Sequence, residues 1–379
     1  MNEVRLGVIG CGGMARSHMG YFDQVPGLRF TAAADVAETC VQPVGEQFGV
    51  NTFPDGHALI RSGEVDAVLI VTPHRTHVEY AVAAFEAGLH VLTEKPAAVT
   101  AKDAQRMNDA ADAHPELVFA IMLNQRTSPT WRKVRQFIDE DRVGKIVRVS
   151  WIMTDWFRTQ AYFDSGTWRA TWQGEGGGVL LNQAPHNIDI LQWLVGMPCR
   201  VTAMAGVGKY HHIEVEDEVT AMLEYPSGAT GVFVTSTGEA PGTNRLEIVG
   251  DKATVVATPG HVEMRENSIP TSEFRETDPS MWGKPAVTHY DITPGEKDPG
   301  HRGITENFIA AILRGEKLIA DGREGIRSLE LANAMLMSGL KGQPVELPMD
   351  RDAYAAMIDE LAANSTFHKA APPDVDRAT

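Results

Sequence analysis

A lysine and a histidine in two separate segments of this 379-residue sequence could act together on a hydroxyl group. Lys95 lies in HVLTEKPAAVT, where a strand pattern ends, and a lysine in that place can stay cationic and polarise an oxygen atom. His186 lies in GEGGGVLLNQAPHNIDILQWLVG, and imidazole titrates near the pH at which a hydroxyl proton must be removed. The pair suits hydride transfer from a carbinol, which needs a base for the hydroxyl proton. The alternatives are a solvated Glu94-Lys95 salt bridge and a histidine buried in the core.

Asn182 precedes His186 by four residues, and this spacing predicts that both side chains lie on one face of a helix. An amide cannot act as a base, so we expect Asn182 to orient a substrate by donating and accepting hydrogen bonds. Asp189 follows His186 by three residues, and it could orient the imidazole or pair with an arginine.

A glycine-rich loop near the N-terminus has the form G-x-G-x-x-A between a strand pattern and a helix pattern. Gly10 would permit the tight turn, and Gly12 would let the backbone approach a pyrophosphate. Asp35 closes the next strand, where a carboxylate can bind the ribose hydroxyls and repel a 2′-phosphate, which favours NAD over NADP. Thr72 and Pro73 end a later strand where a loop would cross the cofactor. The alternatives are an ordinary turn for the loop, a helix N-cap for Asp35 and simple strand termination for Thr72 and Pro73.

The segment 151–175 contains four of the seven tryptophans together with arginine and tyrosine. Sugars stack on indole rings, and guanidinium groups bind oxygens or acids, so we expect a substrate platform here. A subunit interface or a domain core is the alternative. The predicted substrate contacts are Asn182, Arg158, Tyr162, Trp168, Arg169 and Trp172, with His301 as a weaker candidate.

The first part of the chain alternates short apolar runs with helical patterns such as 77–88. Continuous Val-, Leu- and Ile-rich runs are typical of strands buried on both faces of a parallel sheet, so the pattern predicts a doubly wound α/β domain. The predicted strands are 4–10, 29–35, 66–72, 90–94 and 117–123.

After about residue 125 the strand patterns become longer and follow one another closely, which predicts a mainly antiparallel sheet. We therefore expect a Rossmann domain over 1–124, an α+β domain with an open-faced sheet for substrate binding and oligomerisation over 125–349, and a C-terminal helix and tail over 350–379. The predicted strands are 145–155, 199–207, 218–226, 229–237 and 243–250, and the predicted helices are 303–314 and 324–340.

The composition bounds the partners and the compartment. A formal charge of −16 disfavours nucleic acid and anionic membranes as partners. Three cysteines without a CxxC pair fit a reducing cytosol, and we recognise no signal peptide or membrane-spanning stretch, so a cytoplasmic protein is expected. No metal site is expected, because His211, His212, His74 and His77 lack a clear set of partner ligands.

Taken in order, the motifs resemble those of the glucose–fructose oxidoreductase, inositol dehydrogenase and rhizopine-catabolism (Gfo/Idh/MocA) oxidoreductases. The similar blocks span nearly the whole chain: GCGGMA, VTPHRTH, AGLHVLTEKP, Asn124-Gln125-Arg126, GGGVLLNQAPHNIDILQWLVG and HRGITENFIAAI. The resemblance implies a nicotinamide cofactor between two domains, sugar or inositol substrates, and dimers or tetramers built on the open sheet. It also implies that Lys95 polarises the reacting oxygen and that His186 is the general base. The implied cofactor contacts are Gly10, Gly12, Gly13, Met14, Asp35, Thr72, Pro73, His77, Glu94, Lys95, Asn124 and Arg126.

The sequence departs from that family at Asn182, where the family has an aspartate. Our leading hypothesis is an NAD-dependent dehydrogenase that oxidises a secondary hydroxyl of a sugar, glycoside or polyol. The alternative is a glycoside hydrolase that uses NAD transiently, with oxidation at C3, elimination, addition of water and return of the hydride. A non-catalytic NAD-dependent regulator is disfavoured by Lys95 and His186.

Overall fold

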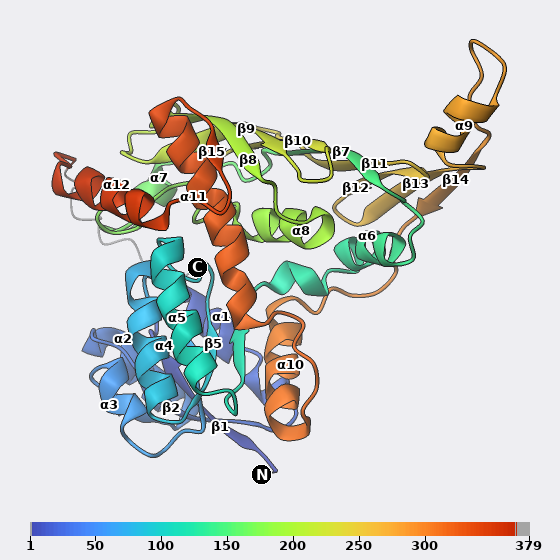
Figure 1. Cartoon of the computed structure of the whole chain (residues 1–379). Helices are drawn as coiled ribbons and strands as arrows, with labels where there is room; N and C mark the ends of the chain where they lie inside the picture. The colour runs from blue at the N-terminus through green and yellow to red at the C-terminus, as the bar shows by residue number, and fades with distance from the viewer. Residues whose placement is uncertain (1, 368, 370–379) are drawn as a thin grey trace.

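A computed structural model describes residues 2–367 and 369 of the chain, which form two units built on separate sheets (Figure 1). The predicted tail over 371–379 lies outside the described residues. In the described part of the chain, no helix combines the length and the apolar character needed to cross a membrane.

The N-terminal unit contains a six-stranded parallel sheet with the order β3-β2-β1-β4-β5-β6. This is the strand order of the dinucleotide-binding Rossmann fold, so the predicted α/β fold is confirmed. The central strands are apolar because helices cover both faces of the sheet; all four residues of β4 are inaccessible to solvent. The strands are β1 (Val4–Ile9), β2 (Leu28–Ala34), β3 (Asn51–Phe53), β4 (Ala67–Ile70), β5 (His90–Thr93) and β6 (Phe119–Ile121). The helices are α1 (Gly13–Met19), α2 (Glu38–Phe48), α3 (Gly56–Ile60), α4 (His77–Glu86) and α5 (Ala101–Ala113).

The second unit contains a nine-stranded sheet with the order β14-β13-β12-β11-β7-β10-β9-β8-β15. Its pairs are antiparallel except for β7 and β10, which confirms the mainly antiparallel sheet. The strands are β7 (Ile146–Met153), β8 (Arg200–Val207), β9 (Glu216–Glu224), β10 (Thr230–Ser236), β11 (Asn244–Gly250), β12 (Ala253–Thr258), β13 (His261–Asn267), β14 (Val287–Ile292) and β15 (Val345–Glu346).

Among the described residues, helices pack on one face of this second sheet, the face toward the N-terminal unit (Figure 1). α11 packs on β8, α8 on β7 and α6 on β12, whereas α10 returns to pack against β1 and β5 of the first sheet. The helices are α6 (Pro129–Asp139), α7 (Gln160–Asp164), α8 (Pro185–Val195), α9 (Thr271–Thr277), α10 (Gly300–Arg314), α11 (Gly325–Lys341) and α12 (Arg351–Ala363).

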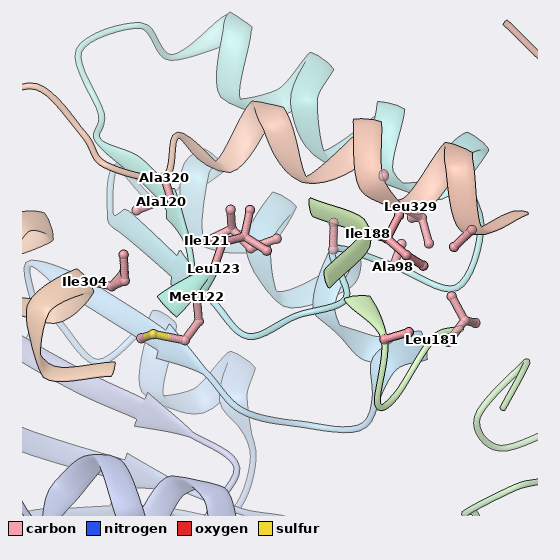
Figure 2. Packing of buried hydrophobic residues seen from close by; sticks show 14 of the residues in the cluster. Ala98, Ala120, Ile121, Met122, Leu123, Leu181, Ile188, Ile304, Ala320 and Leu329 are labelled. Atoms are coloured by element: carbon pink, nitrogen blue, oxygen red, sulfur yellow. The ribbon is translucent and has the colours of Figure 1, made fainter. Parts of the chain in front are cut away.

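Apolar side chains from both units meet in one core between the sheets (Figure 2). Ile121 of β6 and Leu123 beyond it lie near Ile188 of α8 and Leu329 of α11, and all four are at most 2% exposed. This shared core fixes α8, which carries His186, relative to the parallel sheet.

A buried ion pair adds a directional contact to that core. Arg126, in the short helix Asn124–Thr127 after β6, donates from Nε and Nη2 to the carboxylate of Asp189 on α8 at 2.8 and 2.7 Å. Both side chains are 1% exposed, and Arg126 also pairs with Glu324. Asp189 therefore pairs with an arginine, which was one of its two predicted roles.

We predict that Asp189→Asn lowers the free energy of unfolding by about 3 kcal/mol. The substitution removes one of the two carboxylates that balance the positive charge of the buried Arg126 guanidinium. Urea unfolding followed by circular dichroism measures this. The control is Asp139→Asn, whose carboxylate is 55% exposed in its pair with Arg135 and should cost less than about 1 kcal/mol. Equal losses in the two variants would contradict the prediction.

Candidate functional site

The loop between β1 and α1 is shaped for close approach by a ligand. Gly10 has φ +93°, and a Cβ there would lie 2.6 Å from the carbonyl oxygen of Val71, so only glycine fits. A Cβ on Gly12 would meet nothing within 4 Å, which leaves open space beside the backbone. Gly13 begins α1, and Met14 is 39% exposed beside it. These residues fit the pyrophosphate of a dinucleotide.

Asp35 lies at the end of β2 and faces this loop. Its carboxylate accepts hydrogen bonds from the backbone N–H groups of Cys11 at 2.7 Å and Ala37 at 2.8 Å. α2 begins at Glu38 with Ala37 as its N-cap residue, so Asp35 is not the helix cap. Each carboxylate oxygen keeps a free lone pair, and two ribose hydroxyls could be accommodated.

The loops after β4 and β5 are tied together by His77. Its imidazole is fully buried between the carbonyl oxygens of Thr72, at 2.8 Å, and Pro96, at 2.9 Å. His77 therefore positions the loop that contains Thr72 and Pro73. The Lys95-Pro96 peptide bond is cis.

Glu94 is held below the surface by a chain of hydrogen bonds. His18 Nε2 lies 2.7 Å from its carboxylate, His18 Nδ1 lies 2.6 Å from the hydroxyl of Tyr21, and that hydroxyl lies 3.0 Å from Thr305. Burial alone would raise the pKa of Glu94, but the hydrogen bond and charge of His18 and the charge of Lys95 lower it to about 2. Glu94 is therefore a permanent negative charge beside Lys95.

Lys95 joins the two units. Its Nζ donates a hydrogen bond to the main-chain oxygen of Asn182 at 3.0 Å, and the side chain is only partly exposed. Burial lowers the pKa of the ammonium group, while Glu94 and Glu175 act in the opposite direction.

His186 lies in the first turn of α8, next to Lys95. Burial and the charge of Lys95 lower the pKa of His186 to about 3, so the ring is neutral near pH 7. Its Nδ1 is buried and has no hydrogen-bond partner within the described residues. A neutral imidazole whose ring nitrogen has no partner can accept a proton from a bound group.

Asn182 does not share a helix with His186, so that prediction is wrong. α8 begins at Pro185, and Asn182 lies in the preceding turn, where its N–H donates to the oxygen of Gly178. Pro185 has no N–H to donate to a preceding turn and its ring would clash there, so it stands at the first position of the helix, which does not extend back to residue 182. The Asn182 side chain nevertheless faces the site and contacts Tyr162 and Glu175.

Arginine and aromatic side chains surround Tyr162. Arg169 Nη1 donates to the Tyr162 hydroxyl at 2.6 Å and its guanidinium lies 4.4 Å from the ring centre, while that of Arg158 lies 4.9 Å away. Trp168 lies against Arg169 at 4.9 Å. Trp172 is 5% exposed, so its ring is a core group more than a surface platform.

The remaining predicted residues fall into two places. Asn124 Nδ2 lies 3.3 Å from Nδ1 of His301, and the His301 ring is 5.3 Å from that of His18. Asn124 and His301 therefore lie beside the hydrogen bonds that hold Glu94. The guanidinium of Arg126 is instead occupied by Asp189 and Glu324, away from this group.

Two residues of the site were not predicted. His18 lies on α1, and its link to Glu94 joins segments 76 residues apart. Glu175 is 1% exposed and contacts Asn182, although it directly precedes the three glycines and looks like a loop residue in the sequence. Within the described residues, no three histidine, cysteine, aspartate or glutamate side chains converge as metal ligands would.

Two family models match the chain. A model described as an oxidoreductase family with an NAD-binding Rossmann fold matches residues 4–121, and the GFO/IDH/MocA C-terminal domain model matches residues 131–256.

Similar proteins of known activity or structure extend these matches. Levoglucosan dehydrogenase of Pseudarthrobacter phenanthrenivorans is 28% identical and covers 68% of this chain and 74% of its own. Inositol 2-dehydrogenase of Rhizobium meliloti is 26% identical and covers 88% and 96%. The crystal structure of the WlbA dehydrogenase from Bordetella pertussis, in complex with NADH and UDP-GlcNAcA, is 27% identical with a TM-score of 0.79 and covers 92% and 99%.

Another buried carboxylate, that of Glu216, makes the stability of the fold depend on pH. Glu216 is fully buried, and its Oε1 accepts from the N–H groups of Gly178 at 2.9 Å and Leu180 at 3.1 Å. Burial raises the pKa of Glu216 to about 7, against the lowering effect of these hydrogen bonds. In the unfolded chain the group ionises near pH 4.5, so between about pH 4.5 and 7 the unfolded state binds fewer protons. Stability contributed by the protonated group is therefore lost as the pH rises through this window.

We predict that Glu216→Gln reduces the fall in unfolding free energy between pH 5 and pH 8 by about 1–3 kcal/mol, because the amide has no proton to lose. Urea titrations at pH 5, 6, 7 and 8 measure the difference. Glu263→Gln, at a partly exposed position of the same sheet, is the control and should keep the wild-type slope. An unchanged slope in Glu216→Gln would contradict the prediction.

Proposed function

Because the chain belongs to the Gfo/Idh/MocA family of NAD-binding oxidoreductases, we propose that it oxidises a secondary hydroxyl of a sugar, glycoside or polyol. The observation that carries this proposal is the buried Nδ1 of His186, which has no hydrogen-bond partner within the described residues, close to the Lys95 ammonium at the carboxyl edge of the parallel sheet. The names of similar proteins support a substrate of this class, since they include an inositol and a levoglucosan dehydrogenase.

In the proposed reaction, Lys95 donates a hydrogen bond to the reacting oxygen and stabilises the negative charge that develops there. His186 takes the hydroxyl proton, which it can do because its ring is unprotonated near pH 7. Bound NAD supplies the hydride acceptor. The side-chain oxygen of Asn182 and the Tyr162 hydroxyl, which contact each other, would hold neighbouring hydroxyl groups of the substrate.

The nucleotide would be held by groups that already face one another. Gly10 and Gly12 leave room for the pyrophosphate, and the carboxylate of Asp35 has lone pairs for the ribose. Thr72 and Pro73 lie in the loop that His77 fixes.

We predict that Lys95→Ala and His186→Ala each lower kcat/KM by about 100-fold or more, because each removes a group that acts on the reacting hydroxyl. Following NADH formation with a panel of polyols and glycosides measures this, and NAD binding by calorimetry should persist in both variants. The controls are Lys102→Ala and His289→Ala, which change side chains outside the site. Near-normal rates in both site variants would overturn the assignment.

The same assay separates the other possible functions when released aglycone is measured alongside NADH. Net NADH without aglycone release supports the dehydrogenase. Aglycone release with catalytic NAD and no net NADH supports the redox-assisted glycoside hydrolase. Tight NAD binding without turnover of any polyol or glycoside supports a non-catalytic NAD-dependent regulator.

We also propose that the uncovered face of the second sheet joins copies of this chain. Met204, Met222 and Val232 are 72%, 64% and 38% exposed there, and Met222 pairs directly with Val232 across β9 and β10. Exposed apolar groups side by side on a sheet are typical of an interface. We propose in addition that the protein is cytoplasmic, since Cys11 and Cys199 carry free thiols, as is usual in a reducing compartment.

We predict that the wild-type chain assembles beyond its monomer mass of 41.3 kDa and that the double variant Met222→Lys/Val232→Lys shifts toward the monomer, because it places charges in the contact. Light scattering coupled to size exclusion measures the mass. Glu116→Lys, on the surface of the N-terminal unit, should leave it unchanged. A monomeric wild-type chain at micromolar concentration would contradict the proposal.

A further inference from the structure

Glu175 is a buried carboxylate with no role in the site as proposed so far. It is 1% exposed and lies in the turn before the three glycines. Within the described residues no lysine or arginine forms an ion pair with it; its partners are the side-chain amide of Asn182 and the backbone N–H of Ala170 at 2.5 Å. Burying an acid without an ion-pair partner lowers the stability of the fold, so the presence of one here suggests a role in the site.

The backbone around Glu175 is arranged to hold the carboxylate in place. Ala170 has φ +54°, a left-handed conformation that is unfavourable for a residue with a Cβ, and it is fully buried. In this conformation its N–H donates to Oε2 of Glu175, while Oε1 remains for Asn182. The carboxylate is therefore positioned by protein groups before any substrate binds.

Glu175 also decides which way the Asn182 amide points. Burial raises the pKa of the Glu175 carboxyl, while the hydrogen bonds from Ala170 and Asn182 and the charges of Arg169 and Lys95 act to lower it. In its ionised form the carboxylate only accepts hydrogen bonds, and the NH₂ group of Asn182 faces it. The amide oxygen then faces the hydroxyl of Tyr162, which donates to it at 3.3 Å. The Tyr162 oxygen in turn accepts from Arg169 at 2.6 Å and Gln183 at 3.1 Å. A flipped amide would place two acceptors in contact.

We infer that Glu175 is a positioning residue of the proposed dehydrogenase: it fixes the orientation of the Asn182 amide and supplies the negative charge that keeps the Lys95 ammonium protonated. This inference rests on the proposed function. Glu94, the other acid beside Lys95, is already engaged, since it accepts from His18 at 2.7 Å and from the Lys95 backbone N–H at 3.1 Å.

The charge of Glu175 affects the protonation of Lys95, because few acids lie around that ammonium group. Burial lowers the pKa of Lys95, and Glu94 and Glu175 are the two acids that raise it. The other charged or titratable groups that act on Lys95 or that its charge affects are Arg158, Arg169, His74, His77, His186 and His301. None of these groups is an acid, so removal of the Glu175 charge would favour the neutral amine.

We predict that Glu175→Gln moves the alkaline limb of the pH profile of kcat/KM to lower pH by on the order of one unit, because activity is lost as Lys95 deprotonates. The double variant Glu175→Gln/Asn182→Asp returns a carboxylate to the same contact, so its limb should move back toward that of wild type. Asn182→Asp alone places two acids in contact that share one proton, and it should be less active than the double variant.

A second readout needs no substrate. Cyanate carbamylates only the unprotonated amine, so mass spectrometry of the Lys95 peptide after brief exposure at several pH values follows the protonation of Lys95. In Glu175→Gln the reaction should begin at lower pH, while the exposed Lys102 reacts as in wild type. Glu216→Gln, which removes an equally buried carboxylate that holds Gly178 and Leu180, is the matched control and should leave the onset at Lys95 unchanged.

These readouts separate failure of the inference from failure of the proposed function. If wild type turns over polyols and Glu175→Gln keeps both its alkaline limb and its cyanate onset, the inference is overturned. If no polyol or glycoside is oxidised but the onset at Lys95 still shifts, the proposed reaction fails and the charge role of Glu175 stands. Should Glu175→Gln not fold, Glu175→Asp keeps the charge and must keep the wild-type onset, and a shifted onset there would equally overturn the inference.

Discussion

The hydrogen bond from Lys95 Nζ to the main-chain oxygen of Asn182 is the contact on which the site depends. It joins the edge of the parallel sheet to the turn before α8, so the ammonium is placed only when both units are folded and packed. Because the acceptor is a backbone oxygen, this contact does not require any particular side chain at residue 182. The Asn182 side chain is therefore available for other partners, which are Tyr162 and Glu175.

The Lys95 ammonium and the His186 imidazole can lie side by side because only one of the two is charged near pH 7. The charge of Lys95 lowers the pKa of His186, so the imidazole stays neutral, and a neutral ring adds no repulsion to the ammonium. Glu94 acts on Lys95 in the opposite direction to burial. Its own charge is secured by His18, which lies on α1 directly behind the nucleotide loop, so the electrostatics of the site are linked to the cofactor-binding turn.

The fold could be predicted because its buried strands consist of continuous apolar runs. β12, β13 and β14 were not predicted, and the edge strand β14 is largely exposed and polar, so little apolar pattern marks it. The positions of Lys95 and His186 followed from their motifs. The geometry at Asn182 did not, since Pro185 begins the helix three residues later. Glu175 escaped notice because its burial results from contacts with Ala170 and Asn182, which no local pattern encodes.

The three glycines before His186 are better explained by close packing than by flexibility. A Cβ on Gly178 would lie 1.9 Å from the carbonyl oxygen of Glu216, and a Cβ on Gly176 would lie 2.3 Å from Cγ1 of Val99. Val99 belongs to the segment that follows Lys95, whereas Glu216 begins β9 of the second sheet. The glycines thus let one turn pack tightly against both units at once. That packing brings Glu175 and Asn182 to Lys95 and holds them there without a loop that must first become ordered.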